Sequence, residues 1–222
     1  MCPAGGGAGQ PPGDPVRIVP FVIGPMESNA YILADEATRR AAVIDPGMES
    51  ERLLEFLEAE RLRLDLVLNT HGHFDHVFCN GYFTSKTGAR LLIHEADVPL
   101  LRELPEVARQ YGFSVAEAPE PDGFLRDGDI IPVGGMAVRV YHTRGDSPGG
   151  VCLHVGEALF SGDTLFAGSI GCTDLPGGSY QKLVASIRAK LLPLPDATLV
   201  YTGHGPHTSI GDEREYNPFL IG

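Results

Sequence analysis

A strand-like segment that runs into a cluster of histidines constrains this chain most. "LDLVLNT", residues 64–70, has the pattern of a buried strand, and "HGHFDH", residues 71–76, follows it directly. The end of a strand is a place where a loop can fold several side chains around one point. Imidazole nitrogens and a carboxylate suit zinc or a similar divalent ion. The chain has eight histidines and places three of them within these six residues, which argues against a chance polar turn.

The cluster consists of His71, His73, Asp75 and His76. It offers too many ligands for one tetrahedral metal and too few for two, so we expect further ligands at other strand ends. "LFSGDTLF" places Asp163 after an apolar strand, where its two oxygens could bridge two ions. The local pattern supports a turn or helix-cap role for Asp163 equally well. "LVYTGHGP" places His204 between two glycines after another apolar strand, which favours a ligand role.

Strand-like and helix-like patterns alternate along the chain. Helices are expected over 49–61, with Ser50 as the N-cap, over 81–88, and over 179–191, while 95–121 is a helical stretch interrupted by proline. Strands are expected over 16–24, 29–35, 40–47, 64–70, 89–94, 128–133, 136–143, 150–156, 158–164 and 197–206. Two β-rich halves, each with helices, predict one sheet packed on another with helices outside.

The composition excludes several kinds of partner and compartment. The net charge of −12 argues against nucleic acid or an anionic membrane surface, and no apolar run is long enough to span a bilayer. The four cysteines lie far apart without a CxxC pair, which fits a reducing cytoplasm. Residues 1–14 are rich in glycine and proline and lack the features of a signal peptide. We interpret residues 1–14 as a disordered leader and residues 15–222 as a single domain.

In this order the motifs resemble those of the metallo-β-lactamase superfamily of metal-dependent hydrolases, from about Val16 to the C-terminus. "GSIGCTDLPGGS", "YTGHGPHTSIG" and "EYNPFLIG" are similar to the small bacterial glyoxalase II-like branch, the hydroxyacylglutathione hydrolases. The resemblance implies an α/β fold, a four-layer αββα sandwich with the metals at one edge. The order of the expected strands and helices agrees with it.

The resemblance also implies a ligand set for two metals. His71 and His73 would hold the first metal, Asp163 would bridge, and Asp75, His76 and His204 would hold the second. The family takes a third histidine for the first metal from a "HTPGHSPG" hairpin. The same hairpin in this chain is "HTRGDSPG", residues 142–149, so Asp146 stands at the ligand position.

An aspartate at this position changes the first metal site in three ways. A further carboxylate makes the site less positive, so it lowers the pKa of a bound water less. A carboxylate is harder than imidazole, which shifts the preference from zinc toward manganese or iron. Its side chain is also shorter. We therefore expect two zinc sites with the first one weakened, or iron or manganese in their place.

The remaining histidines are expected to be structural. His142 is a possible substitute ligand, but it lies four residues before Asp146, and His94, His154 and His207 have no comparable cluster around them. The branch has an arginine in "GRTDLP" where this chain has Cys172, in a loop that helps to hold the carboxylate of glutathione. A cysteine cannot replace that charge. Cys172 is thus a substrate-binding position with an altered side chain, and either a reactive thiol or a packed cysteine.

The resemblance implies a metal-dependent hydrolase that cleaves a small thioester of the S-2-hydroxyacylglutathione type. A metal-bound hydroxide would attack the thioester, and Asp75 would orient it. Its partner is then a small molecule, and the oligomeric state stays open. Two alternatives remain: an oxidoreductase like the persulfide dioxygenases, with a single iron held by two histidines and an aspartate, and a catalytically weakened member of the fold.

Overall fold

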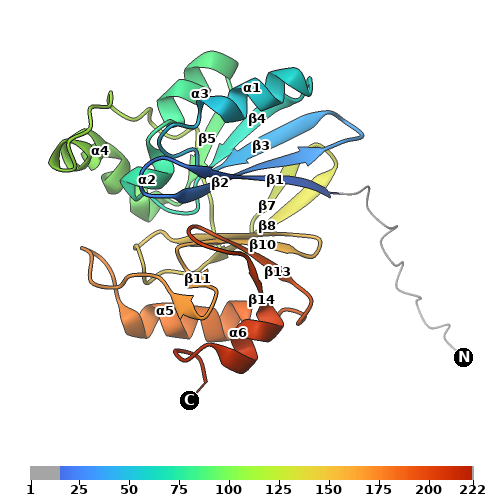
Figure 1. Ribbon diagram of the computed structural model, residues 1–222, viewed down its shortest axis with the longest axis vertical. Coiled ribbons are helices and arrows are strands. Elements are labelled where there is room, and N and C mark those ends of the chain that lie inside the picture. Colours follow the sequence, from blue (N-terminus) through green and yellow to red (C-terminus); the bar gives the residue numbers. More distant parts are fainter. Residues whose placement is uncertain (1–15, 222) are drawn as a thin grey trace, which may run out of the picture.

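The computed structural model describes residues 16–221, so the expected leader, residues 1–14, lies outside the described residues. Two six-stranded sheets face each other at the centre of the molecule (Figure 1). The strands of the first sheet lie in chain order: β1 Val16–Ile23, β2 Ser28–Asp35, β3 Arg40–Ile44, β4 Arg63–Leu68, β5 Arg90–Ile93 and β6 Gly123–Phe124. β1, β2 and β3 pair antiparallel, and β3 to β6 pair parallel.

The second sheet has the order β14-β13-β10-β9-β8-β7. Its strands are β7 Ile130–Val133, β8 Met136–His142, β9 Val151–Val155, β10 Ala158–Gly162, β13 Leu199–Thr202 and β14 Thr208–Ser209. All neighbours pair antiparallel except β10 and β13, which are parallel. A short ribbon of β11 Leu165–Phe166 and β12 Ser169–Ile170 follows β10.

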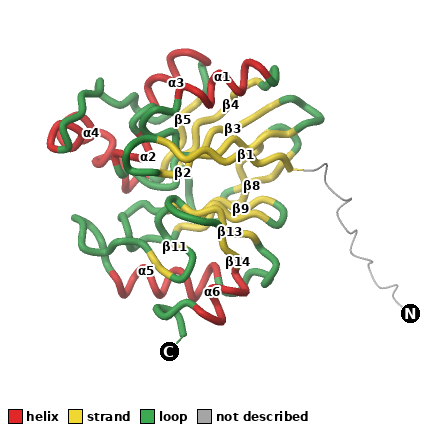
Figure 2. Tube along the Cα trace, in the orientation of Figure 1, coloured by secondary structure: helices red, strands yellow, loops and turns green. Residues whose placement is uncertain are grey.

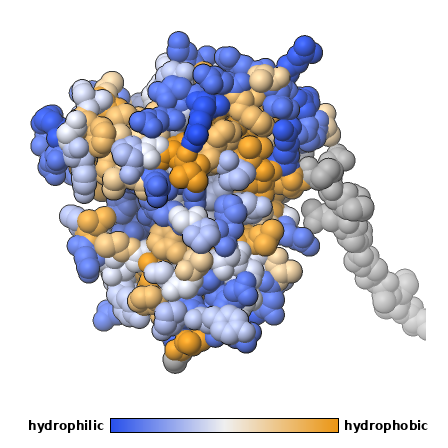
Figure 3. All heavy atoms as spheres, in the orientation of Figure 1, coloured by the Kyte–Doolittle hydropathy of each residue, from blue (hydrophilic) through white to orange (hydrophobic). Residues whose placement is uncertain are grey.

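Helices cover the outer faces of both sheets (Figure 2). On the side of the first sheet these are α1 Glu51–Ala59, α2 Phe74–Val77, α3 Asn80–Thr87, the 3₁₀ turn η1 Glu95–Asp97 and α4 Val98–Gln110. On the side of the second sheet they are α5 Tyr180–Ser186, the π-helical turn η2 Ile187–Leu191 and α6 Ile210–Tyr216. Figure 3 shows that hydrophilic residues cover much of the surface on the face in view.

Three separate apolar clusters fill the three interfaces of these four layers. One contains Leu53 and Phe83 from helices and Val43 and Val67 from the first sheet. The second lies between the sheets and contains Phe160. The third joins the second sheet to α5, η2 and α6. Because each sheet is buried on both faces, the chain forms the four-layer αββα sandwich that the sequence predicts.

The directions of the strands gather several strand ends at one edge. Because β3 is parallel to β4, and β10 to β13, the carboxyl ends of each pair lie together. β8 is antiparallel to β9, which is antiparallel to β10, so β8 runs in the same direction as β10. The residues that follow these five strands are therefore available to one site between the sheets.

The ten expected strands are all present, but local details differ from the expectation. Ser50 does not cap α1 through its side chain, because its Oγ donates a hydrogen bond to the carbonyl of Gly47, at 2.6 Å. The helix expected over 179–191 changes to a π-helical turn at Ile187. The stretch 95–121 keeps helical structure only as far as Gln110, although Pro105 lies inside that helix.

The described residues contain no helix that is both long and apolar enough to cross a membrane. Within the same residues Cys79, Cys152 and Cys172 are free thiols.

Replacing Phe160 with alanine tests the packing between the sheets. Phe160 is fully buried, and its ring centroid lies 5.2 Å from that of Tyr31 and 5.3 Å from that of Tyr201. Phe160→Ala is expected to lower the free energy of unfolding by about 3–5 kcal/mol, measured by urea denaturation. The control Phe219→Ala, on a half-exposed ring, should change it by about 0.5 kcal/mol or less. Equal losses in both variants would contradict the assigned core.

Candidate metal centre

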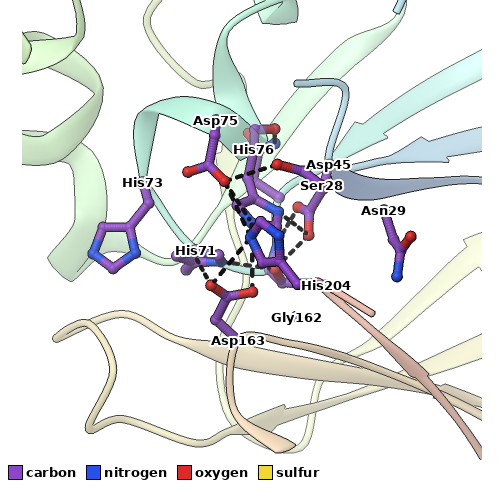
Figure 4. A network of polar contacts seen from close by, with 12 residues as sticks. Ser28, Asn29, Asp45, His71, His73, Asp75, His76, Gly162, Asp163 and His204 are labelled. Atoms are coloured by element: carbon purple, nitrogen blue, oxygen red, sulfur yellow. Dashed lines mark hydrogen bonds and ion pairs between the residues drawn. The ribbon is translucent and has the colours of Figure 1, made fainter. Parts of the chain in front are cut away.

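The structure brings the histidines and aspartates of the predicted ligand set together from both sheets. Figure 4 shows His71, Asp75 and His76 from the segment after β4 facing Asp163 after β10 and His204 after β13. His73 comes from the same loop as His71. The strand ends that the sequence indicated thus meet at one edge of the sandwich.

One group of donor atoms belongs to His71, His73 and Asp163, and these atoms lie within 4.8 Å of one another. Asp146 faces the same space from the hairpin after β8. Its Oδ2 lies 3.4 Å from His73 Nδ1 and 3.8 Å from His71 Nε2. We call these four residues the first metal group. Asp146 is only 3 % exposed, so it is no surface loop aspartate.

A second group is formed by Asp75, His76 and His204, whose donor atoms also lie within 4.8 Å of one another. His204 Nε2 lies 3.1 Å from Asp75 Oδ2 and 3.2 Å from His76 Nε2. The carboxylate of Asp163 lies between the two groups, since Oδ1 lies 3.4 Å from His76 Nε2 and Oδ2 lies 3.7 Å from His204 Nε2 and 3.9 Å from His71 Nε2. This position between the groups fits a bridging carboxylate.

Buried atoms without hydrogen-bond partners show that these residues suit metal ions. Within residues 16–221, His71 Nε2, Asp146 Oδ2 and Asp163 Oδ1 are buried and have no hydrogen-bond partner. Buried polar atoms almost always have one. Each of these three atoms carries a lone pair. His71 Nε2 and Asp146 Oδ2 face each other in the first metal group, and Asp163 Oδ1 faces His76 of the second group, so divalent cations at the two groups would satisfy them.

The electrostatics of the metal-free site are those of a buried anionic cluster. Burial and the nearby Asp163 raise the pKa of the Asp146 carboxyl to about 9. Burial alone would lower the pKa of His76, but Asp75 and Asp163 outweigh it and raise that pKa to about 10. Burial opposes ionisation of Asp75 as well, yet His76, His204 and Ser28 hold its pKa well below the usual range. Asp75 is therefore the ionised carboxylate of the group.

Asp45 is a residue of the site that the sequence interpretation missed. It follows β3, and its carboxylate accepts hydrogen bonds from the backbone N–H and the hydroxyl of Thr70, at 2.7 and 2.6 Å. Its Oδ2 also lies 3.3 Å from His76 Nδ1. A carboxylate behind a metal-binding imidazole fixes the orientation of the ring. The signal was present, because "VIDPG" puts an aspartate at the end of an apolar strand, as in the other motifs.

Two residues at the start of β2 also belong to the surroundings of the site. The Ser28 hydroxyl donates a hydrogen bond to Asp75 Oδ2, at 2.8 Å. The side-chain amide of Asn29 donates to the carbonyls of Thr202 and Gly205, at 3.0 and 2.9 Å, and so holds the loop that carries His204. Nothing in the strand pattern around Ser28 and Asn29 distinguishes them from other polar residues.

Gly203 lets two ligand loops approach each other. A β-carbon at this position would lie 2.0 Å from Asp163 Oδ1 and 2.8 Å from the backbone of Gly162. Since Gly203 N–H also donates to the carbonyl of Gly162, at 2.8 Å, the backbones that carry Asp163 and His204 are in direct contact. Only glycine fits between them.

The structure places the other histidines outside the metal groups. His142 lies with Nε2 3.0 Å from the Pro148 carbonyl and stacks on His94, with ring centroids 4.0 Å apart. Cys172 is exposed and follows Gly171, where a β-carbon would lie 3.2 Å from the Asp146 Cβ. The loop of Cys172 therefore borders the first metal group, and its contact with a substrate stays a prediction.

Comparison with known proteins identifies the family. The family model of the metallo-beta-lactamase superfamily matches residues 23–204, a range that contains every residue of the two metal groups. The chain belongs to the metallo-beta-lactamase superfamily. This is a superfamily of metal-dependent proteins that are usually hydrolases, and the two groups described above are the candidate divalent-metal site of this member.

Relatives within the superfamily cover nearly the whole chain. Hydroxyacylglutathione hydrolase GloC of Haemophilus influenzae is 39% identical over 209 residues, which are 92% of this chain and 97% of that protein. The crystal structure of BLEG-1 B3 metallo-beta-lactamase has a TM-score of 0.86 and 37% identity, and covers 93% of this chain and 100% of its own. TTHA1623 in a di-iron-bound form has a TM-score of 0.82 and 37% identity, and covers 91% and 100%.

The raised pKa of Asp146 predicts a pH dependence of the metal-free protein. Because that pKa is about 9 in the folded state and has its ordinary value of 3.8 in the unfolded chain, unfolding releases a proton between these pH values, and rising pH favours unfolding. An asparagine at this position would have no proton to lose. With metals removed by a chelator, Asp146→Asn should therefore gain stability relative to the unchanged protein as the pH rises from about 5 to about 8.

The measurement is the urea midpoint of both proteins at these two pH values. The raised pKa of His76 acts in the same direction between its ordinary value of 6.5 and about 10, but both proteins retain His76, so the difference between them reports Asp146. If the difference in urea midpoint between the two proteins is the same at both pH values, Asp146 is not held in a buried, anionic environment.

Proposed function

We propose that this chain is a metal-dependent hydrolase of small thioesters, of the S-2-hydroxyacylglutathione type. The position of Asp163 carries this proposal, because its carboxylate lies between two groups of ligand atoms and within 4 Å of histidines from both. A site with two adjacent metals suits the hydrolysis of an acyl bond. The 39% identity to a hydroxyacylglutathione hydrolase over nearly the full length of both chains supports the thioester class.

When bound, the metals would polarise the thioester carbonyl and activate a water molecule at neutral pH. Asp75 is suited to orient that water, because its pKa is low and its Oδ2 is held by the Ser28 hydroxyl. Because this carboxylate is ionised and held in place, it can accept a hydrogen bond from the attacking water and so restrict the orientation of that water. The thiol that leaves has an ordinary pKa of about 8.5, so it departs as a thiolate without a proton donor.

Asp146 is proposed to be a ligand of the first metal in place of an imidazole. Its buried Oδ2 has no hydrogen-bond partner and lies close to both His71 and His73. A carboxylate moves the preference of the site toward harder ions, so iron or manganese competes with zinc there. The di-iron form of a 37% identical protein supports iron as one candidate. Free thiols in the described residues fit a reducing compartment, for which we propose the cytoplasm.

The thioester activity is tested with S-lactoylglutathione, by following the loss of thioester absorbance. We expect turnover that depends on added metal and that His71→Asn lowers at least about 100-fold, because the variant removes a ligand of the first group. The matched control is His154→Asn, since His154 lies on β9 outside both metal groups. Equal loss in both variants, or no turnover by the metal-loaded protein, would contradict the proposal.

Asp146→His tests whether the aspartate is a ligand that changes the metal preference of the first metal group. Imidazole restores the ligand type of the family, so we expect more zinc per chain and a change in turnover of S-lactoylglutathione. Metal content is measured by elemental analysis after loading with zinc, manganese or iron. If neither occupancy nor turnover changes, Asp146 is not a ligand. One iron per chain together with oxygen uptake on persulfides would instead support the dioxygenase alternative.

A further inference from the structure

The buried carboxylate of Asp97 connects the two chain segments that carry the first metal group. Asp97 ends the η1 turn before α4 and is fully buried. It lies in neither metal group. Because a buried carboxylate requires compensating hydrogen bonds, the partners of Asp97 indicate what it does.

Three donors surround this carboxylate, and they come from both segments. Oδ2 accepts a hydrogen bond from the backbone N–H of Gly72, at 2.9 Å, and one from the Ser147 hydroxyl, at 2.7 Å. Oδ1 accepts a hydrogen bond from the backbone N–H of Gly149, at 2.6 Å. Gly72 lies between His71 and His73, and Ser147 directly follows Asp146. One side chain thus holds the histidine loop and the aspartate hairpin together.

The space around Asp97 leaves little freedom for other arrangements. A β-carbon on Gly149 would lie 2.7 Å from the Asp97 carboxyl carbon, and one on Gly72 would lie 3.2 Å from the Asp97 β-carbon. Both backbones therefore press directly against this side chain. Within residues 16–221 no Lys, Arg or His forms an ion pair with Asp97, so hydrogen bonds and these backbone contacts define its position.

We propose that Asp97 is a positioning residue of the first metal group, one that sets the distance between Asp146 and the pair His71 and His73. The inference rests on the proposed function, since it assumes that this group holds a metal. An aspartate reaches less far than a histidine, so a hairpin that carries Asp146 must be held close to the opposite ligands. The hydrogen bonds of Asp97 supply that restraint on both sides.

Asp35 provides a matched control for a variant of Asp97. It is also buried, at 5 % exposure, and its carboxylate also joins two segments. It accepts hydrogen bonds from the Thr38 hydroxyl at 2.6 Å, from Ala37 N–H at 2.9 Å and from Gly135 N–H at 2.6 Å. Asp35 ends β2, whereas the metal ligands lie near the opposite end of that strand, around Ser28.

The experiment compares the metal content of the full chain with that of Asp97→Asn, Asp35→Asn and Ser147→Ala. Each metal-free protein is titrated with cobalt(II), and visible absorption and elemental analysis give the number of ions bound and their affinities. In Asp97→Asn an amide NH₂ replaces one accepting oxygen and faces a donor. We expect the affinity of one of the two ions to fall about 10- to 100-fold, and that of the other to stay unchanged.

Asp35→Asn should bind both ions as the unchanged protein does, although urea denaturation should show a comparable loss of stability. Ser147→Ala removes a single donor, and we expect a smaller fall confined to the same ion. This variant decides the question if Asp97→Asn does not fold. Equal cobalt affinities in all four proteins, or a loss of affinity in Asp35→Asn as large as that in Asp97→Asn, would overturn the proposed role of Asp97. Either result would leave the two-metal proposal intact. An unchanged protein that binds only one ion would overturn the two-metal proposal and this inference with it.

Discussion

The burial of many ionisable groups at one edge of the sandwich is the constraint on which the rest of the structure depends. Asp45, Asp75 and Asp146 are almost fully enclosed, and Asp163 lies among them with the histidines. Carboxylates so close together repel one another, and removal from water makes the repulsion stronger. Hydrogen bonds from the hydroxyls of Ser28 and Thr70 to these carboxylates offset part of the repulsion. Among the buried atoms that remain without hydrogen-bond partners, His71 Nε2, Asp146 Oδ2 and Asp163 Oδ1 belong to the first metal group.

The turn between β4 and α2 is consequently held on both sides of its first ligand. Asp45 binds Thr70, directly before His71, and Asp97 binds Gly72, directly after it. The carbonyl of Thr70 also accepts a hydrogen bond from the N–H of Val151, at the start of β9, which connects the turn to the second sheet. This segment carries four candidate ligands in six residues. Its position is fixed by contacts with three other parts of the fold, namely the residue after β3, the η1 turn and the start of β9.

Most of the architecture and the set of converging residues were predictable, because apolar strands leave clear patterns and each strand end is followed by a polar motif. His204 and, with a turn role left open, Asp163 were indicated in this way, whereas Asp146 was assigned through the resemblance to the family's hairpin; the structure brings all three to the site. Asp97 and Ser28 were not found. Their roles come from contacts across 50 and 47 residues of sequence, and no local period or motif records such contacts. The π-helical turn after Ser186 was not predicted either, since the apolar pattern of 179–191 is that of a continuous helix.

The antiparallel bridge between Ser28 and His204 has a consequence for how the protein is made. It joins the beginning of the second strand to the loop after the thirteenth, so the ligand shell closes only after both halves have formed and met. No early folding intermediate that lacks β13 can chelate with the full set. A complete ligand set therefore requires the folded topology, and an incompletely folded chain would offer a metal ion only part of that set.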